Sequence, residues 1–263
     1  MTVTKRQIPE IIVDGKRLGR HVHHDDRSDA FAVTADGTVA SASWTRVIPV
    51  LDQGNVGSCT GNATVGVLGT DPFDPTEPAG VVLDEAEALT IYSAAEVIDG
   101  DGPYPPNDNG SSGLSVAKAA KNAGLISGYR DIGTVAAAQT VIQTGPFIIG
   151  SDWYTSFDTP DANGLVVITP EATVRGGHEY ECRGYDATTD LWNLVNSWGL
   201  SYGANGEFFY SSTTFAKLLE GSDGDATVFV SLSNPAPVPV PVPVPVPAPT
   251  VSFWKRLWAW LFG

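Results

Sequence analysis

The sequence predicts an α+β fold in which a helical lobe precedes a lobe of antiparallel strands. Apolar residues recur at helical intervals before Pro146, whereas runs rich in β-branched and aromatic residues, bounded by Gly, Asp and Pro, follow it. The 263 residues, 42% of them hydrophobic, are enough for two lobes that share a cleft. Helices and strands that are segregated along a chain in this way pack as separate layers.

Four helices are expected in the first half of the chain. The small residues of CTGNATVGVLG are compatible with a helix that begins at Cys59. Residues 84–98 have acidic residues in the first turn, where the helix dipole is positive, and apolar residues at helical spacing after it. Residues 113–123 form a third helix, which Gly124 ends, and residues 134–143 form the fourth.

Six strands are expected in the second half, because short segments there alternate or are continuously apolar and are separated by turn residues. These segments are residues 147–153, 164–169, 178–186, 191–198, 207–211 and 226–232.

Composition divides the chain into four regions. Residues 1–43 are polar and mixed, and residues 44–234 hold the globular pattern. Residues 235–249 have the sequence PAPVPVPVPVPVPAP, in which alternate residues lack an N–H group. We expect them to form a polyproline II linker of roughly 45 Å. Residues 250–263 form an aromatic, amphipathic C-terminal tail.

The tail combines seven large apolar side chains with Lys255 and Arg256. It is too short to cross a bilayer, which needs about 20 residues. Trp and cationic groups favour the membrane interface, so peripheral membrane binding is one interpretation. Docking into a protein groove is a second interpretation, and a merely sticky terminus is the third.

Charge and cysteine content limit the function classes. The net charge is −15, and a chain so acidic repels phosphate backbones, which argues against nucleic-acid binding. Two cysteines do not make a disulfide framework. We find no signal peptide and no run of roughly 18 apolar residues that could span a membrane, and therefore expect synthesis in the cytoplasm.

No cofactor or metal ion is expected. The run from His21 to Asp26 contains three histidines, but zinc sites draw their ligands from two separated spans, so a solvated loop is the better interpretation.

The segment from Leu51 to Ala63, LDQGNVGSCTGNA, has the properties of a thiol nucleophile site. A thiol must ionise to attack, and a helix N-terminus lowers its pKa below the free value of about 8.5. Gly54 and Gly57 permit a tight turn before Cys59. Gln53 can place its amide N–H₂ over the point that the Cys59 backbone N–H faces, so that both stabilise a developing oxyanion.

Two later segments supply partners for this thiol. His178 follows two glycines and opens a predicted strand, and Asn196 ends another, with Trp198 two residues later. A base that is itself oriented by a third polar group completes a triad. Cys182 has no such pattern around it and is interpreted as a buried packing residue.

These motifs resemble those of the papain and cathepsin family. The order is the same: a glutamine, a Gly-Ser-Cys turn, Gly-His on a strand, and Asn-Ser-Trp-Gly. The similarity covers about residues 44–232. It implies a papain-like two-lobe fold with the active site in the cleft, and cysteine peptidase activity on a peptide or protein substrate.

The resemblance also implies a role for each residue. Cys59 would attack the scissile carbonyl as a thiolate, paired with His178 as imidazolium, and would form a thioester acyl-enzyme. His178 would then protonate the leaving amine. Asn196 would orient the His178 ring, Trp198 would shield their hydrogen bond from water, and Gln53 would stabilise the oxyanion.

Several departures from the family pattern qualify this picture. Thr60 and Val56 stand where plant and animal members have an aromatic residue and a cysteine, so the chain looks like bacterial or bacteriophage relatives. Glu179 stands where a small residue is commoner, and we expect its side chain on the strand face opposite to His178. Residues 1–43 would be either a short propeptide or a strap packed on the body.

Two alternatives to a peptidase are left open by the motifs. The first is a thiol-dependent amidase or transpeptidase that acts on a cell-wall or other peptide. The second is a peptide-binding module that keeps the peptidase fold.

Overall fold

An antiparallel sheet forms the framework of the structure. The computed structural model describes residues 3–76, 80–221 and 223–233. Within these residues the strands pair in the order β4-β9-β5-β6-β7-β8, with β3 beside β6. The strands of this sheet are β3 (Ala42–Ser43), β4 (Gly128–Asp131), β5 (Phe147–Tyr154), β6 (Val174–Asp186), β7 (Leu191–Val195), β8 (Glu207–Ser211) and β9 (Asp225–Val230).

The strand β5 lies between β6 and β9 and sets one row of residues side by side. In this register Gly150 of β5 lies opposite Glu179 of β6 and also opposite Asp225 of β9. Because residues that face one another across a ladder point to the same side of the sheet, both carboxylates lie on one face.

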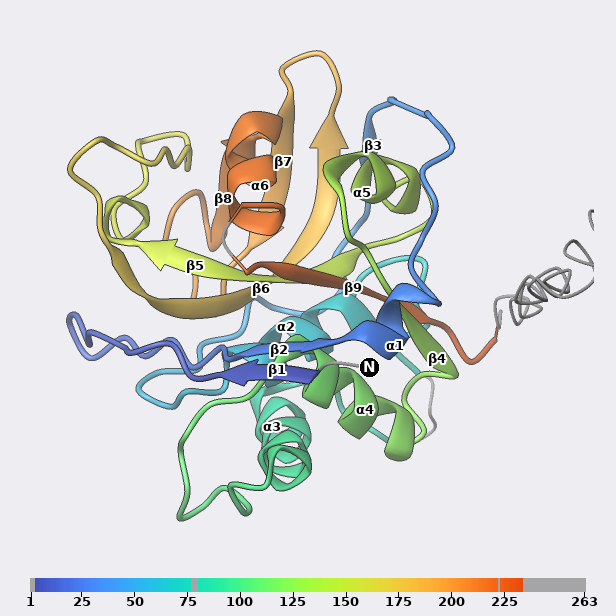
Figure 1. Cartoon of the computed structure of the whole chain (residues 1–263), viewed down its shortest axis with the longest axis vertical. Coiled ribbons are helices and arrows are strands. Elements are labelled where there is room, and N and C mark those ends of the chain that lie inside the picture. The colour runs from blue at the N-terminus through green and yellow to red at the C-terminus, as the bar shows by residue number, and fades with distance from the viewer. Residues whose placement is uncertain (1–2, 77–79, 222, 234–263) are drawn as a thin grey trace, which may run out of the picture.

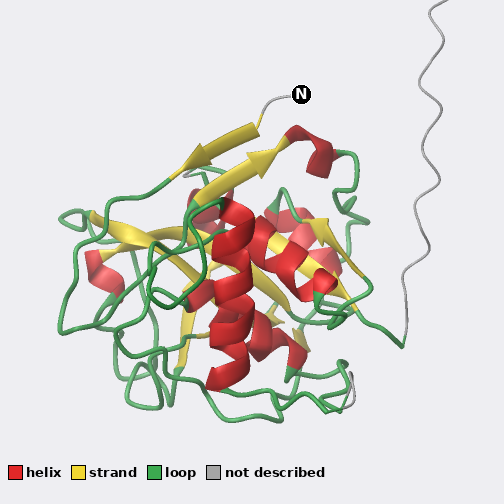
Figure 2. Ribbon diagram, turned by 90° about the horizontal axis from the view of Figure 1, so that it is seen from below, coloured by secondary structure: helices red, strands yellow, loops and turns green. Residues whose placement is uncertain are grey.

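Three helices cover that face, below the sheet in Figure 1 and in front of it in Figure 2. They are α2 (Cys59–Leu68), α3 (Glu85–Asp99) and α4 (Gly113–Asn122). Two of them begin at side-chain caps: Asp84 accepts hydrogen bonds from the first turn of α3, and Ser112 accepts one from the first turn of α4.

The helix α2 is enclosed on every side, and all ten of its residues are buried. Gly61 allows α3 to approach, because a Cβ there would lie 2.1 Å from the backbone oxygen of Ala88. One turn later Gly66 faces the sheet, where a Cβ would lie 2.8 Å from the Glu181 carboxylate of β6. The contacts on both sides fix α2 and therefore its first residue, Cys59.

Aromatic side chains fill the core on the other face of the sheet. The elements that cover this face are α5 (Val135–Val141), α6 (Ser212–Leu219) and the short turn η1 (Thr155–Phe157). Figure 1 shows α5 and α6 above the sheet. The largest buried side chains of this core include Phe147, Trp153, Tyr180, Trp192, Phe208 and Phe215. Cys182 is also buried there and unpaired, as predicted.

The structure confirms the predicted fold class, the four predicted helices and five of the six predicted strands. The strand predicted for residues 164–169 is wrong. This segment makes one isolated bridge, from Leu165 to Phe209. The Asp161 carboxylate accepts the backbone N–H of Leu165 and holds a turn there, and Val167 is 53% exposed. The apolar side chains therefore pack on the edge of the sheet without extending it.

The N-terminal region crosses the boundary between the helices and the sheet (Figure 1). Its elements are β1 (Val3–Arg6), β2 (Val22–Asp25) and α1 (Asp26–Asp29). The strands β1 and β2 pair with one another. The interpretation of the histidine-rich run as a solvated loop is therefore wrong: His21 is 5% exposed, and its Nε2 lies 2.6 Å from the Asn109 carbonyl oxygen. All four residues of β1 are exposed, so no alternation in the sequence marks this pairing.

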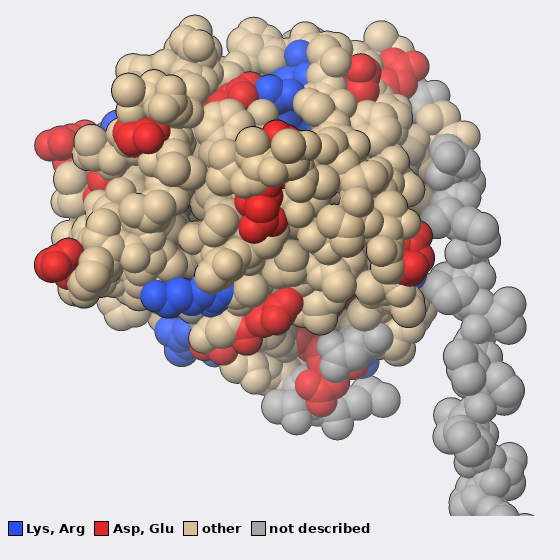
Figure 3. Space-filling model, turned by 90° about the horizontal axis from the view of Figure 1, so that it is seen from above, with Lys and Arg blue, Asp and Glu red and all other residues tan. Residues whose placement is uncertain are grey.

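On the face shown in Figure 3, Asp and Glu are spread widely and Lys and Arg form small groups, in keeping with the net charge of −15. Among the described residues, no helix has the length and apolar character to cross a membrane. The predicted linker 235–249 and tail 250–263 lie outside the described residues.

Packing of α2 on α3 can be tested at Gly61. We expect Gly61→Ala to lower the free energy of unfolding by about 1–3 kcal/mol, the usual cost of overpacking a core, because the new methyl group meets the α3 backbone. Urea unfolding measures this change. The control is Gly128→Ala on β4, where a Cβ would lie 3.8 Å from the nearest neighbouring atom, in Val230. Equal midpoints for the two variants would contradict this account of the helix contact.

Candidate active site

Cys59 is the first residue of α2 and is completely buried. The preceding turn ends at Ser58, whose carbonyl accepts the first helical hydrogen bond, from Asn62. The Cys59 thiol lies close enough to the middle of β6 for the backbone N–H of Glu179 to stabilise its charged form. The helix and the strand thus bring Cys59 beside the residues that adjoin His178.

His178 and Asn196 form a direct hydrogen bond between β6 and the end of β7. The distance from His178 Nε2 to Asn196 Oδ1 is 2.8 Å. The same oxygen accepts the Ser197 backbone N–H at 2.7 Å, which identifies it as the amide oxygen. Nε2 therefore carries the proton, and the neutral ring keeps its lone pair on Nδ1. Within the described residues, Nδ1 has no hydrogen-bond partner and is left available as a base.

Two indole rings enclose the imidazole of His178. The centroid of Trp153 lies 4.8 Å away and that of Trp198 lies 5.1 Å away. Trp198 was predicted as a shield, whereas Trp153 was not singled out. This burial lowers the pKa of His178 to about 3; the hydrogen bond to Asn196 opposes the shift, and the charge of Arg175 adds to it.

Burial acts on the Cys59 thiol in the opposite direction. It raises the pKa of Cys59, and the negative charge of Glu179 raises it further, against the backbone N–H groups that lower it. Both shifts favour the neutral thiol and the neutral imidazole over the thiolate–imidazolium pair. Contact with water or with polar groups of a substrate would remove the desolvation that is the main cause of both pKa shifts.

Gln53 is fixed at both ends of its side-chain amide. Its Oε1 accepts the Ser197 hydroxyl at 2.6 Å, and its Nε2 donates to the Val56 carbonyl at 2.8 Å. Nε2 also lies 3.3 Å from the Arg17 carbonyl oxygen and 3.4 Å from that of Leu18. The predicted oxyanion donor thus faces backbone carbonyls of the N-terminal region.

Residues 17–21 of the N-terminal region, here called the cleft segment, occupy the space between these groups. Gly19 rests on the turn before the nucleophile, where a Cβ on Gly19 would lie 2.2 Å from the Gly57 oxygen. The Arg20 N–H donates to the Gly177 carbonyl, directly before His178, at 2.9 Å. On the helical side the Ser111 N–H donates to the Gly19 carbonyl, and the Ser111 carbonyl accepts from His21.

The cleft segment was not predicted to enter the site. From the sequence, residues 1–43 were expected to be a short propeptide or a strap packed on the body. A signal for entry into the site is the apolar Leu18 beside Gly19 in a polar run. Leu18 is fully buried, and a Cβ on Gly176 would lie 2.5 Å from its Cδ1.

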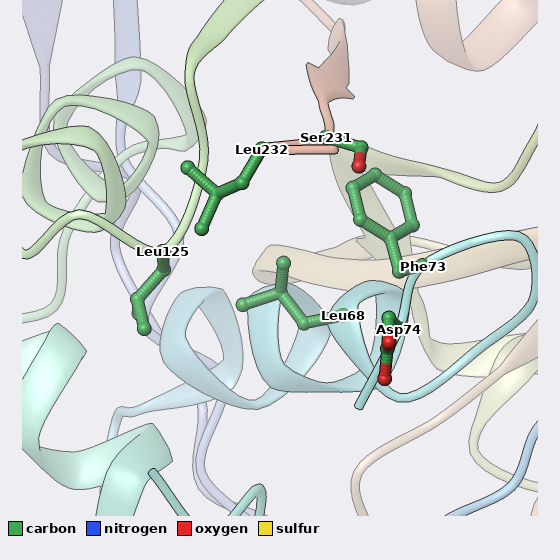
Figure 4. A pocket seen from close by; sticks show the side chains of 6 residues that line it. All are labelled: Leu68, Phe73, Asp74, Leu125, Ser231 and Leu232. Carbon is green, nitrogen blue, oxygen red and sulfur yellow. The ribbon is translucent and has the colours of Figure 1, made fainter. Parts of the chain in front are cut away.

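A hollow lies away from these residues. Figure 4 shows it beside Leu68, the last residue of α2. At the helical rise of about 1.5 Å per residue, Leu68 lies about 14 Å along the helix from Cys59. The hollow is lined by Leu68, Phe73, Asp74, Leu125, Ser231 and Leu232. Its lining carries no pair of polar groups comparable with Cys59 and His178.

Comparison with known proteins gives a match in structure. No family model matches the sequence, and no curated protein matches it. Among solved structures, xylellain, a cysteine protease from Xylella fastidiosa, is similar with a TM-score of 0.59 and 19% identity, over 86% of this chain and 96% of that chain. The chain has a papain-like fold. Digestive procathepsin L 3 from the larval midgut of Tenebrio molitor has a TM-score of 0.53 and 18% identity, with 76% of each chain covered.

The papain-like fold places the predicted residues at one site. Gln53, Cys59, His178, Asn196 and Trp198 were chosen from three separate motifs, and they meet where α2, β6 and the end of β7 adjoin.

The pH dependence of stability tests the buried state of His178. Its pKa is about 3 in the folded chain and about 6.5 when unfolded, so only the unfolded chain gains a proton between these values. Stability should therefore fall as pH falls through this window. Between pH 7 and pH 5 the wild type should lose about 2 kcal/mol more than His178→Gln does, as measured by urea unfolding.

If His178→Gln kept the wild-type pH dependence of stability, His178 would not be held neutral in the fold.

Proposed function

We propose that the chain is a cysteine-type peptidase that hydrolyses peptide bonds through Cys59, His178 and Asn196. One observation carries the proposal: Cys59, at the start of a buried helix, lies at the backbone N–H of the residue after His178. The Nε2 of this histidine is engaged by an amide oxygen, and its Nδ1 has no hydrogen-bond partner among the described residues. This arrangement supplies a nucleophile, a base and an orienting group. The papain-like fold supports it, since the structures reported above are cysteine proteases.

In the proposed reaction, Nδ1 of His178 takes the proton of the Cys59 thiol and the thiolate attacks the scissile carbonyl carbon. The Cys59 backbone N–H and the Gln53 amide donate to the oxyanion. The carbon–nitrogen bond breaks, the leaving amine takes the proton from His178, and a thioester remains. Water then attacks the thioester carbon while His178 removes a proton from the water. The carbon–sulfur bond breaks, the acid product leaves, and the Cys59 sulfur takes the proton back from His178. Asn196 keeps the ring in its reactive orientation throughout.

The N-terminal region bears on how this site is controlled. The cleft segment contacts the turn before Cys59, the strand before His178 and the amide of Gln53, which are the groups that a substrate must reach. We propose that residues 1–43 act as an inhibitory region and that activity requires release of the cleft segment. Release also readmits water, which favours the thiolate and imidazolium forms.

The binding-module alternative has an observation in its favour, because the cleft already holds a peptide backbone, that of residues 17–21. It predicts peptide binding without turnover. The amidase or transpeptidase alternative uses the same chemistry and differs only in substrate.

The nucleophile assignment is tested by Cys59→Ala. We expect the rate of hydrolysis of a broad fluorogenic peptide library to fall by more than about 1000-fold. Loss of the nucleophile alone removes about as much activity as loss of the whole triad. Melting curves check that the fold is kept. Cys182→Ala is the matched control, because that buried cysteine lies in the aromatic core and not at the site. Residual activity near the wild-type level in the Cys59 variant would rule out the assignment.

Inhibition by the cleft segment is tested by Gly19→Val. Gly19 has a φ of +110° and touches the Gly57 oxygen, so a valine strains the backbone and displaces the segment. With a strain of about 1–3 kcal/mol, we expect peptide turnover by the full chain to rise about tenfold or more. The control is Gly15→Val, which shares a positive φ of +72° but has no neighbouring atom within 4 Å. An unchanged or lower rate in a folded Gly19→Val chain would contradict the inhibitory role.

A further inference from the structure

The side chain of Arg20 leaves the cleft segment and enters an acidic pocket. The pocket consists of Glu179 on β6, Asp225 on β9, and two glycines beneath them, Gly113 and Gly150. The Arg20 side chain is fully buried and forms an ion pair with Asp225. Its Nη2 also donates to the Asp223 carbonyl at 2.7 Å. An arginine from residues 17–21 thus lies beside the proposed catalytic centre.

The two glycines make room for the carboxylates. A Cβ on Gly150 would lie 2.4 Å from a Glu179 oxygen and 2.8 Å from an Asp225 oxygen. A Cβ on Gly113 would lie 2.4 Å from the other Asp225 oxygen and 2.9 Å from the other Glu179 oxygen. Together with the strand register, these distances show that the two carboxylates surround one space. That space exists because Gly150 and Gly113 have no side chain to fill it.

In the part of the chain that the structure describes, the pocket holds two carboxyl groups, those of Glu179 and Asp225, but only one guanidinium. Glu179 is fully buried, and neither of its carboxylate oxygens has a hydrogen-bond partner among the described residues. Nε and Nη1 of Arg20 also lack one. Burial and the charge of Asp225 raise the pKa of Glu179, whereas the charge of Arg20 lowers it, so a cation in the pocket favours the ionised carboxylate. Within the ion pairs formed by the described residues, Arg20 is the cation that meets Asp225.

The pocket is continuous with the proposed site. Glu179 directly follows His178, and its backbone N–H lies at the Cys59 thiol. The main chain of Arg20 is bonded to Gly177, and its neighbours are bonded to Ser111 on the helical side. A substrate backbone that replaced the cleft segment would run between the same groups and would present a side chain to the same pocket.

We infer that the acidic pocket of Glu179 and Asp225 determines substrate selection, and that it accepts peptides with an arginine, or less well a lysine, close to the cleaved bond. Arg20 is its internal occupant in the closed chain. Arginine is preferred because its planar guanidinium can meet two carboxylates and a backbone carbonyl at once, whereas an ammonium group is a single point of charge. Selection during cleavage rests on the proposed peptidase function, but binding of the cation does not.

Binding is measured first, without turnover. The full chain with Cys59→Ala and Arg20→Ala has an empty pocket and no nucleophile. Calorimetry with capped peptides that carry Arg, Lys, Leu or Glu at each position in turn should give, at one position, Arg binding at least tenfold tighter than Leu. Glu should bind most weakly. Adding Glu179→Gln should reduce the ratio of Arg to Leu affinity.

Two controls accompany this measurement. Cys59→Ala with Arg6→Ala keeps Arg20 in the pocket and removes instead an exposed arginine that pairs with Asp223, so it should show no gain in peptide binding. If Arg20→Ala is poorly folded, ethylguanidinium at millimolar concentration should raise its melting temperature and leave that of the wild type unchanged. Absence of both the peptide preference and this rescue would overturn the inference.

Turnover separates the inference from the proposed function. With Cys59 present, Arg20→Ala should cleave the preferred Arg peptide at least tenfold faster than its Leu counterpart. Cleavage without preference for a basic residue would overturn the acidic pocket as the selective element and leave the peptidase proposal intact. Tight, Arg-selective binding with no cleavage would uphold the pocket and overturn the peptidase proposal.

Discussion

Exclusion of water from the contact between α2 and β6 is the constraint on which the rest of the structure depends. This contact buries Glu179 and Glu181, two carboxylates on one strand. A buried carboxylate is tolerated where charges and hydrogen bonds compensate it. Glu181 has Arg46 and the Thr70 hydroxyl, both near the C-terminal end of α2. Glu179 has Arg20 of the N-terminal region as the nearby cation that lowers its pKa. One glutamate is thus stabilised from within the body, and the other by the segment whose release we propose.

The same exclusion of water explains the state of the candidate site. Desolvation is the largest cause of the pKa shifts of both Cys59 and His178, and each shift favours the neutral form. The geometry around His178 is nevertheless complete, because Asn196 and the two indole rings belong to the sheet and its core. The hydrogen bond and ring contacts that orient His178 are therefore in place, while burial favours the uncharged forms of Cys59 and His178.

Local sequence signals were sufficient for the fold class, and they singled out residues that the structure brings close together. Acidic first turns, Gly124 and the apolar runs indicated the helices and strands, and the motifs around Cys59, His178 and Asn196 identified the site. The acidic pocket could not be found in this way. Gly150, Glu179 and Asp225 are far apart in the chain, and only the register of three strands sets them in one row. The entry of Arg20 depends on the path of a polar segment with no periodic pattern.

A pocket whose first occupant is encoded in the same chain has an evolutionary consequence. A change of sign at Glu179 or Asp225 would leave Arg20 buried beside like charge, and a change at Arg20 would leave the carboxylates uncompensated. Such changes are tolerated only in pairs. In divergent descendants of this sequence, the residue at position 20 should therefore drift together with those at positions 179 and 225. The residue at position 20 of each descendant would then indicate which substrate side chain its pocket prefers.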